Sequence, residues 1–112
     1  MTPTARRVLL DECVPRRLKR ELAGIDVSDV IAEGWAGRHN GQLLRLMREA
    51  EFHVFVTVDR NLVYQQSVAT SEVAVLVLHA RSNRITDLRP LVPALRAAIP
   101  EAQAGTVTHI GV

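Results

Sequence analysis

The sequence has one cysteine and no long apolar run, and these two scarcities exclude several classes of protein. Because Cys13 has no second cysteine to pair with, the chain forms no internal disulfide, which is typical of a reducing compartment and predicts a cytoplasmic protein. No apolar stretch approaches the roughly 20 residues that cross a bilayer. The basic N-terminus leads into too few apolar residues for a signal peptide, so we expect no membrane partner.

Lysine is also scarce, because Lys19 is the only lysine among the fourteen basic residues and the others are arginines. Arginine favours bidentate contacts with phosphate and carboxylate, which makes a nucleic-acid partner plausible. A biased genomic base composition would enrich arginine equally well. The net charge of +2 therefore excludes no class of partner.

Apolar side chains are abundant, since hydrophobic residues make up 47% of the 112 residues. This fraction is too high for a disordered chain and is sufficient for a compact core. The length suits one domain, which we expect to span residues 1–112.

Short apolar runs that end at polar or charged residues predict the strands. We expect strands at Arg7–Asp11, His53–Val58 and Val73–Leu78, and weaker or edge strands at Ile25–Ile31 and Thr106–Ile110. These strands alternate with helical patterns, and the strongest of them are apolar on both faces. The sequence therefore predicts an α/β fold, a three-layer sandwich around a mostly parallel sheet of four to five strands.

Spacing of apolar residues and boundary residues predict the helices. We expect helices from Pro15 to Gly24, from Gln42 to Glu51 after an N-cap at Asn40, and from Thr86 to Ile99. In the middle helix the apolar stripe consists of Leu43, Leu46, Met47 and Ala50. Two prolines, Pro90 and Pro93, should delay or kink the last helix. The polar segment Asn61–Ser71 has room for a short helical turn.

Two aspartates, Asp11 and Asp59, each come directly after an apolar strand. If the two strands are neighbours, about 4.8 Å apart, both carboxylates lie at one edge of the sheet, where ligands of such folds bind. Glu12 would join them. Two adjacent carboxylates repel unless a cation lies between them, and Mg²⁺ or Mn²⁺ prefers oxygen ligands of this kind. The alternative is that each aspartate only caps the following helix or turn.

A phosphoacceptor receiver domain also has acids after its first and third strands. That activity needs a lysine at the end of the fifth strand, and this chain has no lysine after Lys19. The receiver interpretation is therefore weak.

Three stretches resemble the short PIN-like domains of bacterial toxin–antitoxin operons: "LLDECVPRRLKREL", "EGWAGRHNGQLLRLMREAEFHVFVTVDRNL" and "VAVLVLHARSNR". The resemblance covers about Val8 to Ile99, in the order expected for that family. It implies a divalent-metal-dependent ribonuclease that cleaves RNA beside a small antitoxin protein. Domains of this kind often form homodimers, so a dimer is an open expectation.

Residue by residue, the resemblance implies metal-binding and catalytic roles for Asp11 and Asp59, with Glu12 as a further ligand. Thr57 would support the site by a hydrogen bond to Asp11. Three positions carry amides where relatives tend to have acids, namely Asn40, Gln42 and Asn61. Amide oxygens can bind a hard cation but add no charge. A module of the same fold that binds RNA or a protein without cleaving therefore stays open.

Four polar residues follow the third and fourth predicted strands and are candidates for contacts with RNA phosphate: Arg60, Arg81, Ser82 and Asn83. The alternative is that Arg81, Ser82 and Asn83 form a turn and that Arg60 pairs with the neighbouring acids. Trp35 is expected to anchor its loop on the core, and Cys13 to be a buried structural thiol. The histidines have no spacing typical of metal ligands; they are His39, His53, His79 and His109.

Overall fold

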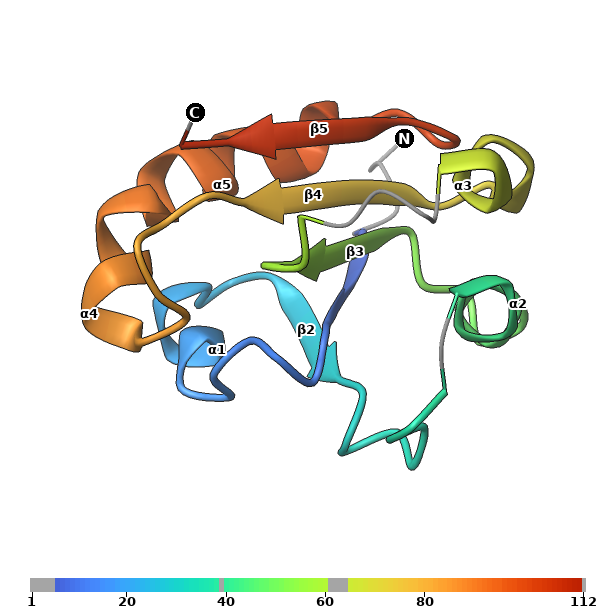
Figure 1. Ribbon diagram of the computed structural model, residues 1–112, viewed down its shortest axis with the longest axis horizontal. Coiled ribbons are helices and arrows are strands. Elements are labelled where there is room, and N and C mark those ends of the chain that lie inside the picture. The colour runs from blue at the N-terminus through green and yellow to red at the C-terminus, as the bar shows by residue number, and fades with distance from the viewer. Residues whose placement is uncertain (1–5, 39, 61–64, 112) are drawn as a thin grey trace.

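The computed structural model describes residues 6–38, 40–60 and 65–111. Its sheet has the strand order β2-β1-β3-β4-β5, and every neighbouring pair is parallel (Figure 1). The strands are β1 (Arg7–Leu10), β2 (Asp26–Asp29), β3 (Val54–Thr57), β4 (Ala74–Leu78) and β5 (Val107–Ile110). The predicted α/β class with a parallel sheet is confirmed, and the two strands predicted to be weak or at an edge, β2 and β5, are the two edge strands.

Helices connect the strands, as parallel pairing requires. They are α1 (Leu18–Glu21), α2 (Asn40–Glu49), α3 (Gln65–Ser71), α4 (Ile85–Leu88), the 3₁₀ turn η2 (Arg89–Leu91) and α5 (Val92–Glu101). The predicted interruption of the last helix is confirmed, because Pro90 lies in η2 and Pro93 in the first turn of α5. A short helical segment, α3, lies within the polar stretch Asn61–Ser71.

Alternate residues of the central strands form two separate apolar layers. Val8, Val56 and Leu76 pack with residues of α1, α4 and α5 on one face of the sheet. Leu9 and Phe55 pack with residues of α2 and α3 on the other face. In Figure 1, α1 and α4 lie together at the left, whereas α2 and α3 lie at the right and are seen end-on. The fold is therefore a three-layer sandwich, with helices on both faces of the sheet.

The buried face of α2 differs from the predicted stripe. Leu43 and Met47 are buried as expected, but Leu44 is buried in place of Leu46, which is partly exposed. The physical reason is that α2 packs on α3 as well as on the sheet, since Leu44 belongs to the same apolar cluster as Val68 of α3. The apolar stripe is therefore shifted toward Leu44 and away from Leu46.

The ends of two predicted helices also differ from the structure. The helix predicted from Gln42 begins at Asn40, so Asn40 is its first residue and not its cap. The helix predicted from Pro15 to Gly24 is helical only over Leu18–Glu21, with turns before and after it. Trp35 anchors its loop as expected, because its ring meets that of Phe52 edge-on with centroids 5.8 Å apart.

Candidate functional site

The candidate site lies where β1 and β3 end side by side. The register pairs Leu10 with Val56, and the Asp11 backbone N–H donates to the Val56 carbonyl over 2.9 Å. The strand order reverses at this point, because the chain goes from β1 outward to β2 and then returns to β3 on the other side of β1. In open parallel sheets, ligands bind in the crevice outside such a switch point. Asp11 and Asp59 both follow strands that flank it.

The Thr57 hydroxyl connects the two aspartates. It donates to Asp11 Oδ2 over 2.7 Å and accepts a hydrogen bond from the Asp59 backbone N–H over 3.0 Å. Thr57 is fully buried, with no exposed surface. A buried hydroxyl that is used as both donor and acceptor has one favoured orientation. The hydrogen bond expected between Thr57 and Asp11 is therefore present, and it holds the Asp11 carboxylate against the end of β3.

Two further neutral donors surround the Asp11 carboxylate. The Glu12 backbone N–H donates to Oδ1 over 2.8 Å, and the Cys13 thiol lies 3.4 Å from Oδ2. Burial raises the pKa of the Cys13 thiol, and the Asp11 carboxylate raises it further, so the thiol stays protonated at neutral pH. Cys13 is only partly buried, which corrects the expectation of a buried thiol.

The other predicted cation ligands are not all brought together. The Glu12 side chain is exposed and accepts a long hydrogen bond, 3.4 Å, from the backbone of Gly37. Gln42 is exposed on the first turn of α2. The side chain of Asn40, and the whole of Asn61, lie outside the described residues. Within the described ranges, no group of three or more His, Cys, Asp or Glu side chains is arranged to hold a metal ion.

The four residues predicted to contact phosphate line one cavity of about 370 Å³, at the ends of β3 and β4. Arg60 is fixed there by a 2.7 Å hydrogen bond to the Ala80 carbonyl, and the Arg81 side chain is exposed. Asn83 donates to the Cys13 carbonyl over 2.9 Å, and Ser82 donates to Asp87. The Asn83 contact connects this cavity to the segment that follows Asp11.

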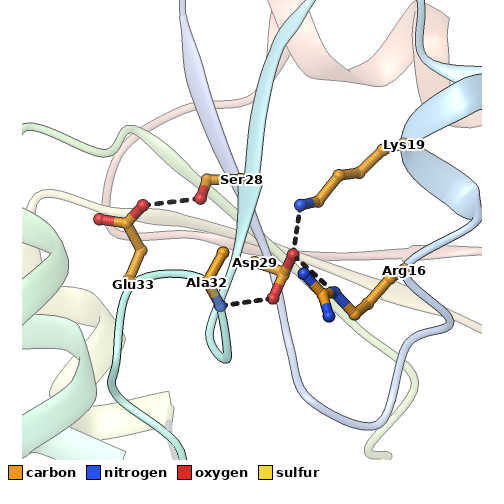
Figure 2. A network of polar contacts seen from close by, with 6 residues as sticks. All are labelled: Arg16, Lys19, Ser28, Asp29, Ala32 and Glu33. Carbon is orange, nitrogen blue, oxygen red and sulfur yellow. Dashed lines mark hydrogen bonds and ion pairs between the residues drawn. The ribbon is translucent and has the colours of Figure 1, made fainter.

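Asp29 is a residue of this edge that the sequence did not single out. It ends β2, in register with Leu10, and it is only 1% exposed. Its carboxylate contacts the Lys19 ammonium, lies 3.3 Å from Arg16 Nε, and accepts a 2.8 Å hydrogen bond from the Ala32 backbone (Figure 2). In the sequence, Asp29 indicated only a weak strand. The available signal was the pair of cations at positions 16 and 19 in the preceding helical segment.

The pKa of Asp29 shows how strongly these partners act. Burial by itself would raise the pKa of this carboxyl group. The hydrogen bonds from Lys19 and Ala32, together with the positive charges of Lys19 and Arg16, outweigh burial and hold the pKa below the usual aspartate value. Asp29 is therefore ionised at neutral pH and is neutralised by its own neighbours.

Comparisons with known proteins identify no family: no family model matches the chain, and no curated protein or solved structure matches it. Among the helices that the structure describes, none has the length and apolarity that crossing a bilayer requires.

Proposed function

We propose that this protein is a PIN-like ribonuclease that hydrolyses RNA phosphodiesters with the help of a divalent cation held by Asp11 and Asp59. The observation that supports this most directly is the Thr57 hydroxyl, which joins the Asp11 carboxylate to the backbone of Asp59 beside the switch point of the sheet. The resemblance of the sequence to short PIN-like toxins supplies the reaction. The proposal is supported at Asp11 by the hydrogen bond from Thr57 that the resemblance implies, and at Asp59 by the contact of its backbone with the same hydroxyl.

The available donors fit Mg²⁺ or Mn²⁺. Mg²⁺ sites in proteins commonly use one or two carboxylates, and water and substrate phosphate complete the shell. Among the residues that the structure describes, the Asp11 carboxylate accepts hydrogen bonds from neutral groups and forms no ion pair. When bound, such a cation activates water and offsets charge on the phosphate. Asp11 and Asp59 would hold it, and Thr57 would keep Asp11 oriented.

The cavity beside Asp59 would receive the RNA backbone. Arg81 is exposed there, and a guanidinium can form two parallel hydrogen bonds with one phosphate group. Arg60, Ser82 and Asn83 are tied to other parts of the protein, so they would shape the cavity and keep its polar groups in place. Toxins of this kind work in the cytoplasm with a small antitoxin, which would cover the acidic edge.

Cleavage of RNA by the purified protein, with Mn²⁺ or Mg²⁺ present, tests the proposal. Asp11→Asn and Asp59→Asn should each lower the rate of cleavage at least about 100-fold. Removing a residue that only hydrogen-bonds a metal ligand already lowers metal affinity or activity about 10–100-fold. Asp26→Asn is the matched control, because Asp26 is exposed at the opposite end of β2, where it pairs with Arg7. Equal cleavage by all three variants would indicate a contaminating nuclease and reject the proposal.

A module that binds RNA or a protein without cleaving is the second candidate. It is favoured by the lack of a metal-binding trio among the described residues and by the exposed amide Gln42 at a position where relatives carry an acid. Calorimetry with Mn²⁺ separates the two candidates. Binding that disappears in Asp59→Asn supports the enzyme. RNA binding without any Mn²⁺ binding supports the module.

The receiver interpretation is weaker than both. The strand order β2-β1-β3-β4-β5 is shared by flavodoxin-like folds, receivers included, so topology alone does not separate them. The lysine that phosphoacceptor chemistry needs would have to come from Lys19. That ammonium group is already paired with Asp29.

A further inference from the structure

Two histidines that are 30 residues apart in the sequence meet at the ends of β4 and β5. His79 Nε2 and His109 Nδ1 are 2.7 Å apart, and the ring centroids are 4.9 Å apart with the planes tilted by 58°. His109 lies within β5, and His79 directly follows β4. Two imidazole nitrogens therefore face each other at hydrogen-bond distance, and which ring donates depends on the tautomers of the two rings.

The backbone around this pair is held closely. The ladder pairs Leu78 with Ile110, and the His79 backbone N–H donates to the Ile110 carbonyl over 2.8 Å. The following residue, Gly111, has φ +88°, and a Cβ added there would lie 2.5 Å from the His79 carbonyl oxygen. Only glycine permits this approach of the end of β5 to His79. Side chains on paired strands are positioned more precisely than side chains on loops.

The exposure of the pair suits metal binding. Neutral imidazole is the form that binds a metal ion. His109 is exposed and His79 is partly exposed, so water can complete a coordination shell.

We propose that His79 and His109 form a chelating pair for a late first-row divalent cation, with Cu²⁺ bound more tightly than Ni²⁺ or Zn²⁺. Bonds from such an ion to imidazole nitrogen are about 2.1 Å long. Two nitrogens bound to one ion in square or tetrahedral geometry then lie about 3.0–3.4 Å apart. The observed separation of 2.7 Å therefore has to open by roughly 0.3–0.7 Å.

The choice of ion follows from the ligands. Imidazole suits copper, nickel and zinc, whereas carboxylate oxygens suit magnesium and manganese. The guanidinium of Arg60 opposes any added cation, so the ion with the strongest bond to nitrogen should bind best, which is Cu²⁺. This site uses neither Asp11 nor Asp59, so it stands or falls independently of the proposed ribonuclease.

The test is a titration of untagged protein with Cu²⁺ and Zn²⁺ by calorimetry, in a Cys13→Ser background that removes the thiol. The tightest binding is expected for one ion per chain, and its affinity should fall at least tenfold in His79→Ala and in His109→Ala. His53→Ala is the matched control and should bind as the parent does, because His53 lies at the other end of the sheet, next to the start of β3, where its Nδ1 accepts a hydrogen bond from the Arg7 backbone N–H.

A second measurement needs no substitution at the pair. Substoichiometric Cu²⁺ should broaden the amide NMR signals of residues 78–80 and 108–110 before any others. Parent-like Cu²⁺ affinity in His79→Ala would overturn the proposal. Broadening centred elsewhere, at His39 or at Asp11 for instance, would overturn it as well, whether or not the variants fold.

Discussion

Asp11 and Asp29 end two neighbouring strands at the same edge of the sheet, yet their surroundings are opposite. Asp29 is buried and is neutralised by Lys19 and Arg16. Asp11 is half-buried and accepts hydrogen bonds from the neutral Thr57 hydroxyl, Cys13 thiol and Glu12 backbone. A carboxylate paired with internal cations stabilises the fold, whereas one oriented by neutral donors keeps its charge available for an external cation. Position at a strand end therefore does not by itself define a metal ligand.

The largest expected effect is a difference in stability between substitutions at the two aspartates. Asp29→Asn leaves the Lys19 and Arg16 charges without their buried partner, and should lower the free energy of unfolding by about 3 kcal/mol. This is the lower end of the cost of breaking a buried ion pair, because both cations reach solvent. Asp11→Asn keeps an oxygen that can accept from the Thr57 hydroxyl, and it should change the free energy of unfolding by less than about 1 kcal/mol. Urea unfolding of both variants measures the difference, and equal losses would contradict the comparison.

Acid should remove the contribution of Asp29 progressively. Because the folded-state pKa of Asp29 is lowered below the ordinary value of 3.8, its stabilisation is complete above that value. The stabilisation is lost as the pH falls through the lowered pKa. The gap in unfolding free energy between the parent and Asp29→Asn should therefore be constant at pH 5–7 and shrink below about pH 4. If this difference in unfolding free energy instead increases as the pH falls, the pKa of Asp29 is not lowered in the folded protein.

The hydrogen bond between Thr57 and Asp11 should matter more for activity than for stability. Thr57→Val preserves shape and removes the hydroxyl, so Asp11 and the Asp59 backbone lose a shared partner. RNA cleavage should fall about 10–100-fold, as expected when the outer partner of a metal ligand is removed. Thr57→Ser restores the hydroxyl and should recover most of the rate. Comparable rates for the Val and Ser variants would exclude an orienting role for Thr57.

The smallest effect distinguishes the two partners of Asp29. The Arg16 side chain is 60% exposed and lies 3.3 Å from the carboxylate, whereas Lys19 is 30% exposed and makes the closer contact. Arg16→Gln should cost at most about 1 kcal/mol, as exposed pairs do. Lys19→Gln should cost more. Thermal or urea unfolding measures the loss of stability in each variant. A larger loss in Arg16→Gln than in Lys19→Gln would mean that Arg16 is the main counter-ion of Asp29.

Much of the fold could be predicted from local patterns. The five strands lie within or next to the predicted ranges, and the proline-rich end of the chain divides into α4, η2 and α5 as Pro90 and Pro93 indicated. The face of α2 could not be predicted, because the burial of Leu44 depends on α3, which packs beside it. A single helical pattern contains no information about how many neighbours the helix will have.

The candidate site was only partly predictable. Asp11 and Asp59 were recognisable because each comes directly after an apolar strand, and Thr57 was indicated by the resemblance to PIN-like domains. Asp29 resembled a polar residue of a weak edge strand, and nothing local indicated its burial. The pairing of His79 with His109 depends on the β4–β5 register and on the close approach at Gly111, and neither is visible in their spacing.

The sequence by itself determined the alternation of strands and helices, the parallel class of the sheet and the placement of acids directly after β1 and β3. It did so because apolar periodicity and chain direction are local properties. Only the tertiary structure decided that Thr57 lies against Asp11, that Asp29 is enclosed by Lys19 and Arg16, and that His79 meets His109. These contacts join residues that are 10 to 46 positions apart, and strand order, register and packing, all non-local, bring them together.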